Sequence, residues 1–142
     1  MIIPDINLLV YAYNSDAPDH RKAQAWWEGA LSESQPVALP WVVLLGFVRI
    51  MTSRRILPSP LTMAEATVHL RSWLEQPQTL ILHPGPRHLD LLEDLAARAR
   101  VTGEMTTDLH LAALAIEHQA ELHSNDADFS RFPGLRWLNP LR

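Results

Sequence analysis

Residues 106–126 read TTDLHLAALAIEHQAELHSND, and this stretch contains the pattern that decides the fold. Residues 107–119 predict a helix, since most are apolar residues or good helix formers. Residues 121–123 follow as a short strand, and the polar turn Ser124-Asn125-Asp126 comes directly after it. A helix that leads into a short strand is typical of proteins built on a parallel sheet.

The same alternation extends outward to both ends of the chain. Further strands are predicted at residues 2–4, 36–39, 79–82 and 135–138. Further helices are predicted after Asp5, over 19–31 with Asp19 as a cap, over 40–54 with Pro40 in the first position, and over 62–75 and 87–100. Short strands that alternate with helices predict an α/β fold, with helices on both faces of a short parallel sheet.

Length and composition limit the class of protein. The 142 residues, of which 47% are apolar and 20% charged, predict one globular domain over residues 1–142. The absence of cysteine excludes disulfides, thiolate zinc sites and cysteine nucleophiles. The longest apolar run, residues 37–48, is too short to span a membrane. No basic segment of a signal peptide is visible, so we expect a cytoplasmic protein.

The charge balance bears on nucleic-acid binding. A net charge of −4 is not typical of a basic nucleic-acid binder. It does not exclude a nucleic-acid enzyme, because carboxylates gathered at a metal site lower the net charge without changing the rest of the surface. Eleven of the twelve cations are arginine, which suits bidentate contacts with phosphate. Arg49 and Arg54 are the candidates for positioning phosphate, with a solvated helix end as the alternative. The five tryptophans, Trp137 among them, are candidates for stacking on bases.

Three aspartates occupy similar places in the predicted fold. Asp5 follows the first strand, Asp126 follows strand 121–123, and Asp108 opens the helix before that strand. Because ligands gather at the carboxyl ends of parallel strands, we expect the three side chains to meet in one crevice. A hard cation such as Mg²⁺ or Mn²⁺ relieves the repulsion among them. Such a site activates water and stabilises charge on a phosphodiester.

Each aspartate also has an ordinary structural explanation. Asp5 and Asp108 could cap helices, and Asp126 could form an Asx turn. The chain would then be an α/β interaction protein whose stability does not respond to divalent metal. No G-x-S-x-G elbow, Walker motif or Rossmann glycine pattern is present, so the sequence offers no anchor for serine-nucleophile or nucleotide-binding chemistry.

Three blocks of the sequence resemble PIN-domain ribonucleases, most closely the VapC-type toxins of bacterial toxin–antitoxin pairs. The blocks are PDINLLVYAY at residues 4–13, TTDLHLAALAIEH at 106–118 and SNDADFSRF at 124–132. The resemblance covers nearly the whole chain and implies a three-layer α/β/α sandwich. It implies a Mg²⁺- or Mn²⁺-dependent endoribonuclease that cleaves structured RNA such as tRNA or rRNA. It also implies a VapB-type antitoxin as partner, and a homodimer.

The resemblance assigns roles to particular residues. The acids that match the family's catalytic metal ligands are Asp5, Asp108 and Asp126. The accessory positions that match are an acid at Asp128, a hydroxyl at Ser124 and a bracing amide at Asn7.

One position departs from the family pattern. The helix after the second strand is expected to carry a glutamate three residues before Arg49, and Gly46 stands there instead. A glycine in mid-helix costs about 0.5–1 kcal/mol relative to alanine. We favour the loss of a metal-site glutamate, by drift or by deliberate replacement, which would weaken or abolish activity. The alternative is a natural glycine that makes room for a close helix contact. A second hypothesis for function is therefore a catalytically silent PIN fold that acts by binding antitoxin or RNA.

Overall fold

The computed structural model describes all 142 residues and contains a five-stranded parallel sheet. The strands are β1 (Ile2–Pro4), β2 (Val37–Pro40), β3 (Thr79–Leu82), β4 (Glu121–His123) and β5 (Arg136–Leu138). Their order across the sheet is β3-β2-β1-β4-β5, and every neighbouring pair runs parallel. Strand β1 is central and pairs with β4 in register, so the residues that follow these two strands emerge side by side.

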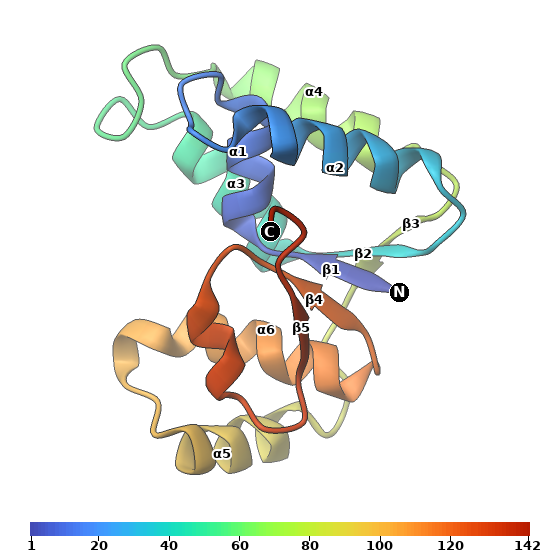
Figure 1. Cartoon of the computed structure of the whole chain (residues 1–142), viewed down its shortest axis with the longest axis vertical. Helices are drawn as coiled ribbons and strands as arrows, with labels where there is room; N and C mark the ends of the chain where they lie inside the picture. The colour runs from blue at the N-terminus through green and yellow to red at the C-terminus, as the bar shows by residue number, and fades with distance from the viewer.

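Helices cover both faces of this sheet, as predicted. They are α1 (Ile6–Tyr13), α2 (His20–Ser32), α3 (Trp41–Met51), α4 (Met63–Leu74), α5 (His88–Ala99) and α6 (Thr106–Glu117), with short 3₁₀ helices η1 (Gly103–Met105) and η2 (Ala127–Arg131). Figure 1 shows α1 to α4 on one side of the sheet and α5 and α6 on the other. The result is a three-layer α/β/α sandwich.

Apolar strands form the centre of the core. All residues of β1 and β2 are buried, which is typical of parallel strands with helices on both faces. The edge strand β3 is only partly buried. Large side chains such as Phe47, Trp73 and Leu122 fill the layers between sheet and helices. None of the helices has the length and apolar character that crossing a bilayer requires.

A polar network fixes α5 against α6 and thereby holds the start of α6. His88 Nε2 and His110 Nδ1 share a hydrogen bond of 2.8 Å between the two helices. The carboxylate of Glu117 accepts hydrogen bonds from the backbone N–H groups of Gly85 and Arg87, at 2.9 and 3.2 Å. Burial, together with the neighbouring His88, lowers the pKa of His110, which favours its neutral form.

Three local predictions were wrong in detail. Asp19 lies at the N-cap of α2, but its side chain makes no cap hydrogen bond and instead accepts from Arg142. Pro40 ends strand β2 and precedes the first helical residue, Trp41, instead of occupying that position itself. Helix α3 also ends at Met51, earlier than predicted. In the first case a residue far along the chain competes for the carboxylate, which no local pattern reveals.

Candidate active site

The junction of β1 and α1 positions Asp5. The backbone N–H of Asp5 donates to the carbonyl oxygen of His123 at 2.8 Å, which continues the pairing of β1 with β4. Its Oδ1 accepts from the backbone N–H of Ile6 at 2.7 Å, so Asp5 is also the N-cap of α1. The residue is 7% exposed, and burial raises the pKa of its carboxyl. A buried carboxylate of this kind gains from a nearby cation.

The turn after β4 brings Ser124 to the same carboxylate. Its Oγ donates to Oδ2 of Asp5 at 2.6 Å and accepts from the backbone N–H of Asp126 at 3.0 Å. Oδ1 of Asp126 accepts from the backbone N–H of Asp128 at 2.9 Å and caps η2. A single buried hydroxyl therefore connects two of the predicted acids. The bond from the Asp128 amide is the Asx-turn contact that was the alternative explanation for Asp126, and Asp126 also lies at this edge of the sheet.

Asp108 reaches the site from α6, in the layer that covers the other face of the sheet. Helix α6 begins at Thr106 with Met105 as its N-cap, so the alternative explanation that Asp108 caps the helix is wrong. The pKa of Asp108 is raised to about 6, chiefly by burial and then by three negative charges. Those charges belong to Asp5, Asp126 and Asp128. The structure thus brings the four predicted acids near enough to influence one another.

The donor set of this site suits a hard divalent cation. No three His, Asp or Glu side chains stand close enough together to enclose a metal ion in the arrangement observed. The groups gathered there are nevertheless all oxygen donors, which Mg²⁺ and Mn²⁺ prefer. Oδ1 of Asn7, two residues after Asp5, is buried and accepts no hydrogen bond. A buried acceptor without a partner is costly, so the residues present fit a cation bound nearby.

Gly46 is buried in α3 at a close approach to α1. A Cβ atom at this position would lie 2.9 Å from Cγ1 of Ile6 and closer still to its Cδ1. Ile6 stands between Asp5 and Asn7 in the sequence, so its side chain fills the space where a longer residue at position 46 would begin. This packing gives a physical basis to the interpretation that the glycine makes room for a helix contact. The loss of a glutamate stays a prediction.

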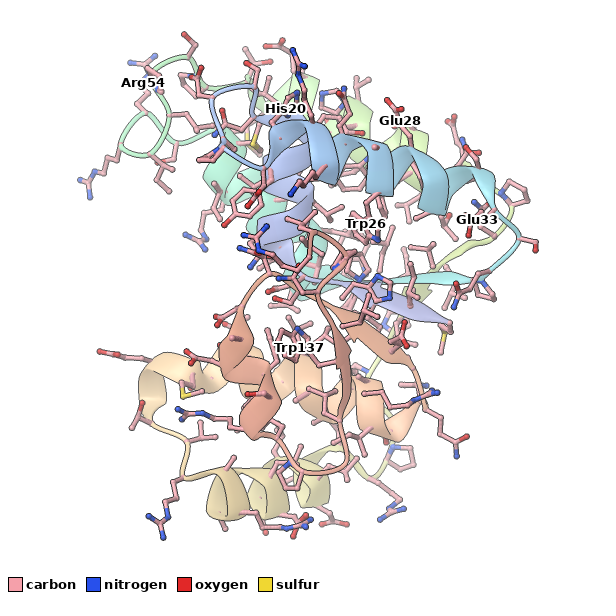
Figure 2. The ribbon with its side chains drawn as sticks, viewed as in Figure 1. His20, Trp26, Glu28, Glu33, Arg54 and Trp137 are labelled. Atoms are coloured by element: carbon pink, nitrogen blue, oxygen red, sulfur yellow. The ribbon has the colours of Figure 1, made fainter.

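The two arginine candidates lie at and beyond the end of α3. Arg49 is exposed in the last turn of the helix, and Arg54 is exposed in the loop between α3 and α4. Figure 2 shows Arg54 on that loop, away from the sheet. Neither side chain forms an ion pair within the chain, so both guanidinium groups are free to bind an anion.

Sequence patterns did not assign any residue to contacts with the turn after β4, and the structure places two there. Trp137, labelled in Figure 2 and a candidate for base stacking, donates from Nε1 to the carbonyl oxygen of Ser124 at 3.0 Å. Nδ2 of Asn139 donates to Oδ1 of Asn125 at 3.1 Å. These contacts exist because β5 pairs with β4, so only the order of strands in the sheet could have revealed them.

Comparison with known proteins identifies a matching family model and similar full-length relatives. Residues 2–135 match the family model described as PIN domain. Ribonuclease VapC33 from Mycobacterium tuberculosis is 47% identical over 142 residues, which cover 100% of this chain and 99% of the relative. Ribonuclease VapC37 from the same organism is 39% identical over 140 residues, covering 99% and 97% of the two chains.

Solved structures share the fold at low sequence identity. VapBC2 from Rickettsia felis, bound to a DNA fragment from its promoter, superposes with a TM-score of 0.72 at 21% identity over 98% of each chain. VapBC-1 from nontypeable Haemophilus influenzae gives a TM-score of 0.72 at 16% identity over 100% of each chain. The extent of the family match and the identity to full-length relatives lead to one conclusion: the chain belongs to the PIN-domain family, among its VapC-type members.

Proposed function

We propose that the protein is a Mg²⁺- or Mn²⁺-dependent endoribonuclease and the toxin of a type II toxin–antitoxin pair. One observation carries the proposal: Asp5, Asp126 and Asp128 each raise the pKa of Asp108, which supports a shared site for the four acids beside the carboxyl ends of the central strands. The names of relatives 47% and 39% identical, both ribonucleases, support RNA as the substrate.

The catalytic ligands we propose are Asp5, Asp108 and Asp126. A bound cation supplies charge stabilisation for the phosphodiester and lowers the pKa of water. The chain's part is to hold the acids. Ser124 fixes the buried Asp5 carboxylate by a hydrogen bond of 2.6 Å. Asp108, with a pKa of about 6, would give up the proton that it still carries near that pH if a cation were bound.

The accessory residues support the same site. Asp128 adds negative charge beside Asp108, and Asn7 contributes a buried oxygen that has no partner within the chain. Arg49 and Arg54 are exposed and unpaired, which suits contacts with the RNA backbone. We propose structured RNA such as tRNA or rRNA as the substrate class, on the family resemblance.

We propose a VapB-type antitoxin as the protein partner, together with a homodimer and a cytoplasmic location. The similar solved structures are VapBC complexes. An apolar groove between α3 and α4 supports a protein partner, because its lining residues Trp41, Leu45 and Met63 are 46%, 59% and 61% exposed. Exposed apolar surface gathered in one groove is typical of protein interfaces.

The second candidate is a catalytically silent binding module. The observation that favours it is Gly46. This glycine stands where the family resemblance places a further acid, so no carboxylate is present, and the side chain of Ile6 fills the space beside it. This candidate retains antitoxin or RNA binding without cleavage.

A cleavage assay separates the two candidates. The chain, its Asp126→Asn variant and its Ile6→Ala/Gly46→Glu double variant are incubated with total RNA in Mn²⁺ or in chelator. The Ile6 substitution makes room for the glutamate side chain. In Gly46→Glu alone, the side chain of Ile6 occupies that space. We expect cleavage by the unmodified chain in Mn²⁺, and none in chelator or with Asp126→Asn. Cleavage by the double variant alone would favour the silent module, and cleavage in chelator would refute metal dependence.

A further inference from the structure

The turn that carries Ser124 and Asp126 is held by the C-terminal segment, residues 136–142. The backbone N–H of Ser124 donates to the carbonyl oxygen of Leu138 at 3.0 Å, and Nε1 of Trp137 donates to the carbonyl oxygen of Ser124 at 3.0 Å. Two consecutive residues of the segment therefore satisfy both backbone polar groups of Ser124. Because Ser124 is fully buried, water is not an alternative partner for either group.

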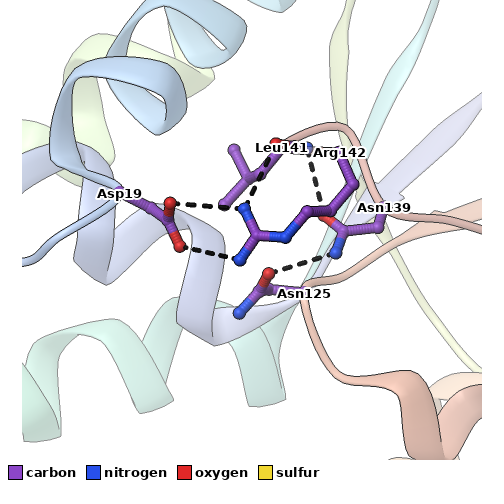
Figure 3. Close-up of polar contacts among 5 residues, drawn as sticks. All are labelled: Asp19, Asn125, Asn139, Leu141 and Arg142. Atoms are coloured by element: carbon purple, nitrogen blue, oxygen red, sulfur yellow. Dashed lines mark hydrogen bonds and ion pairs between the residues drawn. The ribbon is translucent and has the colours of Figure 1, made fainter.

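The next residue of the turn is held in the same way. Asn139 donates from Nδ2 to Asn125 at 3.1 Å, and its Oδ1 accepts from the backbone N–H of Leu141 at 3.0 Å. Leu141 is 4% exposed and belongs to the core, which anchors the segment. Figure 3 shows Arg142 beyond it, donating to both carboxylate oxygens of Asp19 at 3.3 Å. The segment thus connects the turn to the start of α2.

The placement of Ser124 bears on two carboxylates. Its Oγ donates to Asp5 and accepts from the amide of Asp126, so a displaced turn would move Asp126 and remove a donor from Asp5. We propose that Trp137 and Asn139 are positioning residues that hold this turn in the arrangement that cation binding needs. Neither touches the acids directly. The proposal rests on the metal-dependent function proposed above.

The substitution Trp137→Phe isolates the contact. It removes the indole N–H and keeps an aromatic ring in β5, so the carbonyl oxygen of Ser124 loses a donor while most of the packing remains. Groups that orient metal ligands typically contribute about 10–100-fold to metal affinity or activity. We therefore expect Trp137→Phe to weaken Mn²⁺ binding about 10-fold by calorimetry. The kcat for RNA cleavage should fall by about the same factor, with KM unchanged.

A readout without metal tests the holding of the turn itself. In the metal-free protein, the amide of Asp126 should exchange its hydrogen faster in Trp137→Phe than in the unmodified chain, because its acceptor, Ser124 Oγ, is less fixed. Asn139→Ala is a second variant, which deletes the contact with Asn125 and is expected to act in the same direction. Arg136→Ala is the matched control, since Arg136 lies in the same strand but its side chain contacts the carbonyl oxygen of Gln119.

The outcomes distinguish this proposal from the proposed function. Weaker Mn²⁺ binding and faster exchange in both variants, but not in Arg136→Ala, would support positioning. Unchanged Mn²⁺ affinity in folded Trp137→Phe and Asn139→Ala, while the unmodified chain binds Mn²⁺ and cleaves RNA, would overturn positioning and leave the function standing. An unmodified chain that neither binds Mn²⁺ nor cleaves RNA would overturn the proposed function, and the positioning role with it.

Discussion

At the scale of single residues, the site depends on one hydroxyl. Ser124 Oγ is fully buried and makes short contacts with the Asp5 carboxylate and the Asp126 amide. Burial raises the pKa of Asp5, and the hydrogen bond from Ser124 acts in the opposite direction. The hydrogen bond from Ser124 therefore favours the ionised form of Asp5, against the effect of burial.

Ser124→Ala should destabilise the protein at neutral pH. The change leaves a buried carboxylate oxygen without its donor, which costs about 1–3 kcal/mol. Urea unfolding measures the loss as a lower midpoint with an unchanged slope. Ser130→Ala is the control, because Ser130 is exposed in η2. Equal midpoints for Ser124→Ala and the unmodified chain would show that the hydrogen bond has no net effect.

Asp108→Asn should stabilise the metal-free protein at neutral pH. The pKa of Asp108 is about 6 in the folded protein against an ordinary value of 3.8, so ionisation of Asp108 opposes folding. That penalty is absent below about pH 4 and fully present above about pH 6. The side chain is half-buried, so solvent screening reduces the gain to about 1 kcal/mol, or about 2–4 °C in Tm.

The measurement for Asp108→Asn is thermal unfolding in chelator, at about pH 7.5 and about pH 4. The variant should exceed the unmodified chain in Tm at the higher pH, and the difference should vanish at the lower pH. Asp16→Asn, at an exposed loop position, is the control and should give no difference at either pH. A variant that is less stable at the higher pH would contradict the mutual repulsion of the acids.

At the scale of elements, two helical glycines differ in their surroundings. A Cβ at Gly46 would collide with Ile6 across the α1–α3 contact, whereas a Cβ at Gly29 in α2 would meet nothing within 4 Å. Gly29→Ala should therefore raise stability by about 0.5–1 kcal/mol. Gly46→Ala should lower it by about 1–3 kcal/mol through overpacking.

The paired glycine variants are compared by urea unfolding, and Ile6→Ala/Gly46→Ala completes the set. Removing most of the Ile6 side chain should recover part of the loss caused by Gly46→Ala, because the collision is with that side chain. A stabilising Gly46→Ala would mean that α1 and α3 separate at little cost, and the close-contact interpretation of the glycine would fail.

The elements also show what the sequence alone could predict. Strands β3 and β4 lie where the apolar segments between turns predicted them, and Thr62 caps α4 with a capping box. Such features depend on near neighbours in the chain. The contact between Gly46 and Ile6 depends on how closely two helices approach, which no local pattern contains.

In the site, too, local patterns predicted some features, and contacts between distant elements determined the others. Asp5 and Asp126 could be placed together because each follows a strand, and parallel strands end at one edge. The cap explanation failed for Asp108 because α6 begins at Thr106, so Asp108 lies inside its first turn. The contacts of Trp137 and Asn139 were invisible because they depend on which strand lies beside β4.

At the scale of the whole molecule, the two helical layers meet at the acidic site. Asp5 belongs to the start of α1 on one face of the sheet, and Asp108 to the start of α6 on the other, as the arrangement in Figure 1 indicates. A cation bound by both would join the layers, and its stabilisation of the native state should grow with the logarithm of its concentration once that exceeds the dissociation constant. The central claim is therefore that these acids share one ion.

The most direct test is calorimetric titration of the metal-free protein with Mn²⁺, in buffers of different ionisation enthalpy. Because the pKa of Asp108 is about 6, binding at about pH 6 should release about half a proton per ion, and almost none at about pH 8. Asp108→Asn should reduce the proton release and weaken binding. No binding heat in any buffer, or proton release that is unchanged in Asp108→Asn, would contradict a shared ion at these acids.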